Sequence, residues 1–480
     1  MSIVAVATAV RLFRLDFFSY GLDEILQSFW LHGTWRFFWK SIRFDAVHPP
    51  LDYLLGRTFE LLQPSDWVRK IADVAWGVGT VAALAVLIRR RVGTPAGVVA
   101  ALLLAAAPFH VRYSQELRPY ALGCFLLVFS LIALDFFLER PSAVRLIALY
   151  AACLATAYTL YLAAVVLAIA GGGVLLEDAV SADSERKRRA LRFLVWSPLF
   201  CLALFLGYLP WLPVVLEAAR RAPPVASTPL TWDRAGRTVA FFGFSSRDGL
   251  PFRPVDLIFI ALAVAGCVTA IRTRGARFLA VWSIGGFAVV ETLWQLHPHW
   301  DATRRYLPAG LALPAVTALA FVSVGRSRIG RPLSICVLAI FLLLNGAALR
   351  SYFRDGRPDW RPLGQALRAR PSVERLFTEN QYSQICVAYF VVGPQWLYEA
   401  MTEGAAKTGR PILNLEGEIQ RLTFSWDPGT TSWLVISSGT PAPDLRHWAT
   451  QFRRTDFPAA EGAVLYRLDP AQREAALRGR

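Results

Sequence analysis

Eleven apolar stretches, each close to the length of a membrane-spanning helix, constrain the fold of this chain more than any other feature. A helix crosses the hydrocarbon core of a bilayer with roughly 20 predominantly apolar residues. Hydrophobic residues make up 55% of the 480-residue chain, which is more than a water-soluble domain usually carries. The sequence therefore predicts a mainly α-helical, polytopic membrane protein with about 11 transmembrane helices. The stretches lie at about residues 1–15, 72–88, 95–110, 119–138, 145–160, 162–177, 193–211, 254–271, 278–294, 307–324 and 332–350.

The loops between these stretches form two alternating sets, one of which is rich in arginine. Lysine and arginine in short loops favour the cytoplasmic side of a membrane. We therefore expect a multi-pass protein of the plasma (inner) membrane whose N-terminus is cytoplasmic. The first stretch lacks a small-residue cleavage site and is predicted to be an uncleaved anchor. The basic loops contain Arg89–Arg91, Arg140 with Arg145, Arg186–Arg192, Arg272–Arg277 and Arg326–Arg331.

The other set of loops is predicted to face outward. Its first member, at about residues 16–70, contains two apolar segments that also carry charged residues, at 30–42 and 49–62. If 49–62 crossed the membrane, every later arginine-rich loop would change sides, which the charge rule rejects. We interpret both segments as juxtamembrane helices that lie along the outer leaflet. Residues 1–350 are thus predicted to form the transmembrane domain.

Residues 355–480 are predicted to form a separate, extracytoplasmic α/β domain. The segments 383–392, 431–437 and 462–468 have the composition of strands, and 394–409 has the pattern of an amphipathic helix that ends at glycine. Strands that alternate with helices indicate a small α/β fold. Cys386 is the only cysteine of this region, so a disulfide within it is excluded.

Four clusters of ionisable residues lie in the predicted outer loops. Asp23 and Glu24 begin the first loop, and His48 precedes two prolines that fix a rigid turn. In 112–120 Glu116 is flanked by two arginines, and 297–306 adds two histidines and two further arginines. Taken singly, each has a structural alternative, such as a helix cap, a salt-bridged cap or an interfacial anchor. Their occurrence on one side of the membrane instead indicates a site in which carboxylates accept a proton and arginines hold a phosphate.

The order of these motifs resembles that of a known family. An acidic pair (23–24), HPPL (48–51), YSQELRPYAL (113–122) and RYLP (305–308) follow one another. This order is similar to that of the dolichyl-phosphate-mannose–protein mannosyltransferase-like group of the GT-C superfamily. The group includes bacterial aminoarabinose transferases and rhizobial lipopolysaccharide glycosyltransferases. The resemblance covers about residues 16–350, and the order of motifs is more specific than any single one.

The resemblance implies an inverting glycosyltransferase that moves a hexosyl or pentosyl group from a polyprenyl-phosphate donor to an acceptor on the outer face. The acceptor is a glycan, lipid or protein of the cell envelope. Asp23 is the implied catalytic base, with Glu24 beside it. The implied contacts to the donor phosphate are His48, Arg118, Arg305 and Tyr306. Those implied to bind substrate are Tyr113, Gln115, Glu116 and Tyr120.

Three further points concern partners and alternatives. His297 and His299 are candidate ligands of a divalent metal, although an H-x-H pair alone is a weak signal and no cofactor is certain. Membrane lipid is an expected partner, and nucleic acid is not. The alternatives are a transporter or flippase of lipid-linked sugars, or a membrane-anchored glycan-binding protein. Charged residues near the middle of a span would mark a transport path, and Asp135 and Glu291 come nearest to that position.

Overall fold

The computed structural model divides the chain into two compact units. The first contains Met1–Leu15 and Ser41–Gly356, and the second contains Asp16–Lys40 and Arg357–Arg480. The described residues are 2–17, 19–31, 33–62, 66–221, 231–245, 251–296, 303–355, 359–368, 376–378, 385–387, 389–390, 412–414, 432–436, 452–457 and 463–468.

Helices occupy all eleven of the apolar stretches in the first unit. Among the described residues, six helices are long and apolar enough to cross a membrane, or seven if the bent pair at 303–324 is one span. The prediction of a multi-pass, mainly helical protein is thus confirmed, while a total of eleven crossings stays a prediction. The helices are α1 (Ile3–Leu12), α5 (Asp66–Arg91), α6 (Thr94–Ala106), α8 (Tyr120–Glu139), α9 (Ala143–Ala157), α10 (Tyr161–Ala179), α11 (Ser184–Tyr208), α14 (Asp256–Arg272), α15 (Arg277–Ala280) continued by the π-helical turn η1 (Val281–Gly285) and α16 (Gly286–Leu296), α17 (Leu307–Gly310) with α18 (Ala312–Val324), and α19 (Gly330–Asp355).

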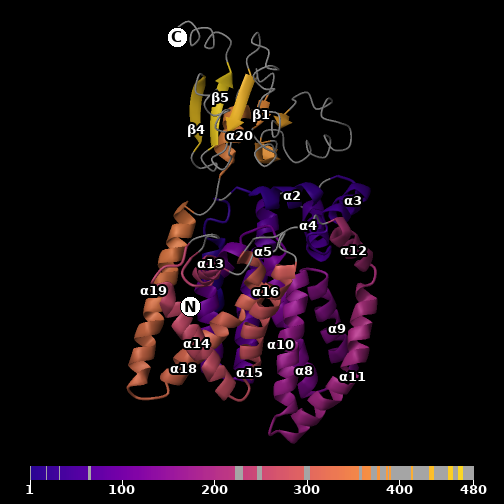
Figure 1. Cartoon of the computed structure of the whole chain (residues 1–480), viewed down its shortest axis with the longest axis vertical. Helices are drawn as coiled ribbons and strands as arrows, with labels where there is room; N and C mark the ends of the chain where they lie inside the picture. Colours follow the sequence, from indigo (N-terminus) through magenta and orange to yellow (C-terminus); the bar gives the residue numbers. More distant parts are fainter. Residues whose placement is uncertain are drawn as a thin grey trace. The chain divides into compact units, whose positions relative to one another are not determined.

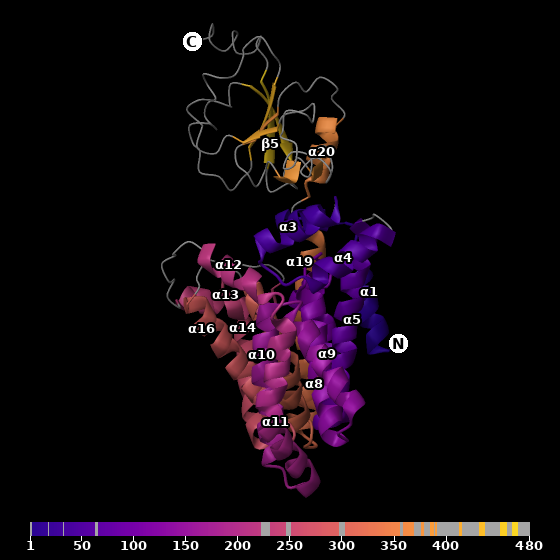
Figure 2. The same cartoon turned by 90° about the vertical axis from the view of Figure 1, so that its right-hand side faces the viewer.

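Short helices gather at one end of this bundle. Figures 1 and 2 show α4 (Leu51–Leu62), α12 (Leu212–Arg221) and α13 (Trp232–Phe242) at the same end. The two expected juxtamembrane segments are helical, because α3 (Trp35–Asp45) and α4 cover most of 30–42 and 49–62. The short helix α7 (Pro108–Tyr113) and the 3-10 helix η2 (Thr303–Tyr306) complete the described elements that surround the candidate site.

Close approach of helices holds the bundle together. Apolar side chains of α5, α6, α8, α10 and α18 form a continuous buried core. At Gly266 of α14 an added Cβ would collide with the carbonyl oxygen of Val316 in α18, so a larger residue could not be placed there without moving a helix. Small residues at helix contacts favour association within membranes, where burial from water does not supply the driving force.

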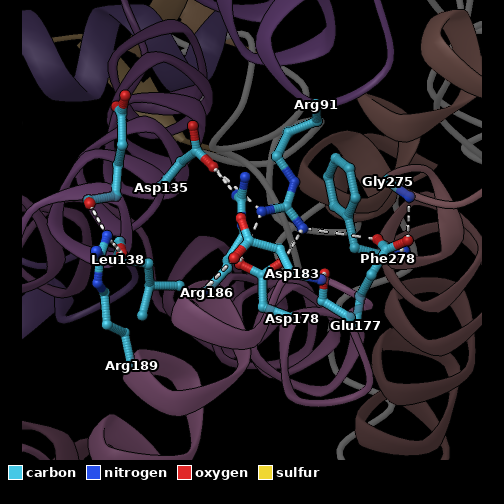
Figure 3. A network of polar contacts seen from close by, with 12 residues as sticks. Arg91, Asp135, Leu138, Glu177, Asp178, Asp183, Arg186, Arg189, Gly275 and Phe278 are labelled. Carbon is cyan, nitrogen blue, oxygen red and sulfur yellow. Dashed lines mark hydrogen bonds and ion pairs between the residues drawn. The ribbon is translucent and has the colours of Figure 1, made fainter.

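At the end of α5 that is predicted to be cytoplasmic, buried charges link several helices (Figure 3). Arg91 pairs with Asp178 of α10 at 2.9 Å and with Asp135 of α8 at 3.1 Å. Arg186 of α11 contacts the same two carboxylates, at 2.9 Å to Asp178 and 2.5 Å to Asp135. Glu177 accepts hydrogen bonds from the backbone N–H groups that begin α15. Removing one partner of such a buried pair typically costs about 3–5 kcal/mol.

The second unit contains a five-stranded mixed sheet in the order β2-β1-β3-β5-β4. The strands are β1 (Leu376–Thr378), β2 (Ile412–Asn414), β3 (Ser432–Ile436), β4 (Arg453–Phe457) and β5 (Ala463–Leu468). β1 is parallel to β2 and β3, whereas β5 is antiparallel to β3 and β4.

Of the three strands predicted from the sequence, two are present and the third is not a strand. Strands at 431–437 and 462–468 are confirmed by β3 and β5. The strand expected at 383–392 is wrong, because residues 385–387 and 389–390 are helical. An unbroken apolar run does not by itself distinguish a buried strand from a buried helical turn. The helix expected at 394–409 lies outside the described residues.

Candidate active site

The first site element is a strained turn that begins α4. Ala46 has a φ of 48°, a left-handed conformation that a non-glycine residue rarely adopts. Its carbonyl oxygen accepts a hydrogen bond from the Tyr161 hydroxyl at 3.2 Å, and Tyr161 in turn accepts one from the Trp211 indole at 3.0 Å. The Leu51 N–H donates to the Tyr158 carbonyl at 2.9 Å. These contacts with the ends of other helices fix the turn and the direction of His48.

Contact with Arg118 determines the protonation form of His48. Nε2 of His48 lies 2.8 Å from Nη2 of Arg118. A guanidinium can only donate, so Nε2 must be the acceptor and the imidazole proton lies on Nδ1. That Nδ1 is buried and has no hydrogen-bond partner in the described part of the chain. His48 therefore presents a neutral N–H donor that an incoming oxygen atom can use.

The charges of two further arginines act on the same imidazole. Burial lowers the pKa of His48 well below its usual value, and the charges of Arg118, Arg304 and Arg305 lower that pKa further. The structure thus brings together three of the four residues predicted to contact the donor phosphate, from the α4 turn, the loop before α8 and η2. Because of this lowered pKa, His48 contributes a hydrogen bond rather than a positive charge.

The neutral state of His48 predicts a pH-dependent loss of stability. The unfolded chain binds a proton at this residue below about pH 6.5, whereas the folded chain does not, so the stability is fully present above that pH and falls below it. Between pH 6.5 and 5.5 the loss approaches about 1.4 kcal/mol per pH unit. Thermal unfolding in detergent should therefore decline more steeply with acid in the wild type than in His48→Gln. Parallel declines in the two proteins would contradict this assignment.

Tyr113 and Tyr120 line the same region from the other side. Tyr120 meets the His48 ring edge-on at 5.7 Å between centroids, and Tyr113 meets Tyr120 in the same way at 5.2 Å. Both tyrosines are buried. Glu116 forms an ion pair with Arg112, whose Nε lies 3.1 Å from Oε1. The sequence left open whether Arg118 pairs with Glu116, and in the structure the Arg118 guanidinium contacts His48.

Gln115 occupies a buried network that joins three helices. Its amide Nε2 donates to the carbonyl oxygens of Arg11 and Phe13, at 2.7 and 3.0 Å. Its Oε1 accepts a hydrogen bond from the Tyr352 hydroxyl at 3.0 Å. These contacts hold the loop before α8 against the ends of α1 and α19. The geometry favours a role for Gln115 in shaping the site, alongside the substrate contact that the resemblance implies.

The predicted base lies in the second unit. Asp23 and Glu24 are in the first turn of α2 (Leu22–Leu31). Glu24 is buried, and its Oε2 accepts a hydrogen bond from the Gly21 N–H at 3.0 Å, as a carboxylate does when it caps a helix start. Asp23 is half-buried. Between the two acids, the geometry therefore favours Asp23 for proton transfer.

The candidate metal ligands and the acids nearest to mid-span have different outcomes in the structure. His297 and His299 lie outside them, and no group of three histidine, cysteine or carboxylate side chains that could hold a metal occurs within them. Asp135 belongs to the arginine cluster at the predicted cytoplasmic end of α8. Glu291 pairs with Arg234 of α13. Both acids that the sequence placed nearest to mid-span are thus paired with arginine.

Sequence reasoning missed two neighbours of His48. Asp45 accepts a hydrogen bond from the Tyr53 hydroxyl at 3.4 Å and from the Val47 N–H at 3.3 Å. Tyr53 is fully buried, and burial together with the charges of Asp45 and Asp52 raises its pKa well above the usual value, so it stays a donor. The close spacing of Asp45 and Tyr53 around the two prolines was the available signal.

Residues 47–211 match the family model described as dolichyl-phosphate-mannose-protein mannosyltransferase. The fold resembles that of ArnT from Cupriavidus metallidurans in the apo state, with a TM-score of 0.59 and 15% identity, and that of ArnT bound to undecaprenyl phosphate, with a TM-score of 0.58 and 14% identity. Each comparison covers 98% of both chains. No curated protein sequence matches this chain.

Proposed function

We propose that this protein is a GT-C glycosyltransferase that transfers a sugar from a polyprenyl-phosphate donor to a cell-envelope acceptor, a proposal supported by the family-model match at 47–211 and by the ArnT-like fold. The observation that carries the proposal is the buried pair of His48 and Arg118, together with the half-buried Arg304 and Arg305 whose charges act on the same imidazole. Arginine forms strong, charge-assisted hydrogen bonds with phosphate oxygens. ArnT from Cupriavidus metallidurans has been solved with undecaprenyl phosphate, a ligand of this chemistry.

The proposed reaction is a single displacement at the anomeric carbon. A carboxylate, Asp23, accepts the proton of an acceptor hydroxyl while that oxygen attacks the anomeric carbon. The bond from this carbon to the phosphate oxygen breaks, and the polyprenyl phosphate leaves with the electron pair. Arg118, Arg305 and the Nδ1–H of His48 stabilise the negative charge that develops on it. Attack opposite to the leaving group inverts the anomeric centre.

A transporter or flippase is less well supported. The two acids nearest to mid-span, Asp135 and Glu291, are paired with arginine, and the densest ionisable groups of the described bundle lie at helix ends. A transport path would place unneutralised charge along the middle of the spans.

Purified protein incubated with a panel of radiolabelled polyprenyl-phosphate sugars and cell-envelope extract tests the function. Transfer of label to an extracted glycan, lipid or protein is the expected result. Label that crosses a vesicle membrane without chemical transfer would instead identify a transporter, and absence of both would reject the proposal. The same panel identifies the sugar.

Sidedness is tested separately by labelling cysteines introduced at exposed positions. Pro362→Cys and Lys187→Cys, in a background without the native cysteines, place thiols in the C-terminal region and in an arginine-rich loop. An impermeant thiol reagent added to spheroplasts should label Pro362→Cys, because that region is predicted to be extracytoplasmic. It should label Lys187→Cys only after lysis. The opposite pattern would invert the predicted topology.

A further inference from the structure

The carboxylate of Glu291, in α16, has three side-chain partners. The Arg234 guanidinium and the Tyr306 hydroxyl contact its two oxygens, and the Gln295 amide donates to Oε1 at 2.7 Å. Arg234 is buried and comes from α13, whereas Tyr306 ends η2. Glu291 therefore joins α13, α16 and η2, three elements that are separate in the sequence.

Trp294, one turn further along α16, connects this cluster to Arg305. The Arg234 guanidinium lies 4.7 Å from the centre of its ring and that of Arg305 lies 5.6 Å away, both within range of a cation–π contact. The Tyr306 ring stacks on Trp294 with 5.9 Å between centroids. The Trp294 ring thus contacts both Arg305, which is predicted to bind the donor phosphate, and Tyr306, which follows it.

The indole N–H of Trp294 is a hydrogen-bond donor that a bound ligand could use. The indole N–H of Trp294 is buried and has no hydrogen-bond partner among the described residues. A buried polar group without a partner costs about 1–3 kcal/mol, so native proteins seldom retain one that no ligand or water satisfies. A phosphate or sugar oxygen of a bound donor would satisfy this N–H.

We propose that Glu291 is a positioning residue: with Arg234 it fixes Trp294 and Tyr306, and through them it sets the direction of Arg305 toward the donor phosphate. The proposal rests on the function proposed above and deepens it. A long arginine side chain loses rotamer freedom when it binds, and a preset direction reduces that cost. Glu291 itself need not touch the donor.

A double-mutant cycle tests this relation, with undecaprenyl phosphate as the probe and its affinity for the purified protein as the measurement. Glu291→Gln keeps the size of the side chain and removes the charge that holds Arg234. It should weaken binding about tenfold in the wild-type background and less than about twofold in the Arg305→Ala background, since residues that act through one another are not additive. Equal loss in both backgrounds would overturn the proposal.

Asp256→Asn provides the matched control. Asp256 is likewise a fully buried carboxylate paired with an arginine, but it lies in α14, and its ion pair is with Arg253 of the preceding loop. It should leave the affinity unchanged, and an equal loss there would show that any buried ion pair has the same effect. If Glu291→Gln does not yield folded protein, Tyr306→Phe removes only the hydroxyl that contacts Glu291 and takes its place in the cycle. Failure of the wild type to bind undecaprenyl phosphate would reject the proposed function itself.

Discussion

Asp23→Asn should lower the turnover of sugar transfer by about a hundredfold or more, because asparagine has the same shape but cannot accept a proton. Proton transfer by a positioned base typically contributes a factor of about 10²–10⁴ to the rate. The variant should still insert and fold, since Asp23 is half-buried and lies in the first turn of α2, where asparagine is also tolerated. Initial rates with a labelled donor, together with the amount of protein recovered from membranes, measure both effects.

Glu24→Gln is the control for this substitution. Glutamine retains an oxygen that can accept the hydrogen bond from the Gly21 N–H, so the start of α2 should survive. We expect Glu24→Gln to keep more than about a tenth of the wild-type turnover. The reverse ranking, in which Asp23→Asn stays active and Glu24→Gln does not, would assign the base to Glu24.

Arg118→Ala and Arg305→Ala are expected to have the other large effect, each lowering turnover about a hundredfold. Arg118 is buried and contacts the His48 imidazole, and the charge of the half-buried Arg305 acts on the same ring, so both are shielded from bulk water, where a contact to developing charge is worth less. The loss should persist when the donor saturates the enzyme, because these contacts strengthen as the phosphate leaves. Steady-state kinetics with donor and acceptor varied independently separate the two substrates.

Two outcomes would reassign these arginines. Full recovery of turnover at saturating donor would mean that they contribute equally to the ground state and the transition state, which removes the leaving-group role. Arg118 has a second alternative, since it also holds His48 through a 2.8 Å hydrogen bond. Arg118→Lys keeps the charge but not the planar geometry, so retained activity there would favour charge over hydrogen-bond geometry.

Features of one chain segment were predictable from the sequence, and features that depend on distant segments were not. Helices on all eleven apolar stretches follow from composition and length, which act locally. The two prolines after His48 and the arginine before Tyr306 were visible as motifs. The proton position on His48, however, is set by Arg118, 70 residues away, and could not be derived from either motif alone.

The same limit explains the interpretation of Glu291 and of the C-terminal region. In the sequence Glu291 is an acid near mid-span, and only folding brings Arg234 and Tyr306 to it. In the second unit, residues 385–387 are apolar enough for a strand, yet they form a helical turn in which Cys386 is buried. Local propensity is a weak guide where tertiary contacts determine which conformation buries an apolar run.

The charge cluster around Arg91 has a consequence for biogenesis. Asp135 follows Arg91 by 44 residues and Asp178 follows it by 87, so Arg91 is synthesised well before either partner. At about 5–20 residues per second, roughly 4–17 s of translation separate Arg91 from Asp178. During this interval Asp135, which is made first, is the earlier of the two partners that can neutralise the guanidinium. A variant that lacks Asp178 would keep the contact of Arg91 with Asp135 but lose two hydrogen bonds to its guanidinium, and the amount of folded protein recovered from membranes should fall.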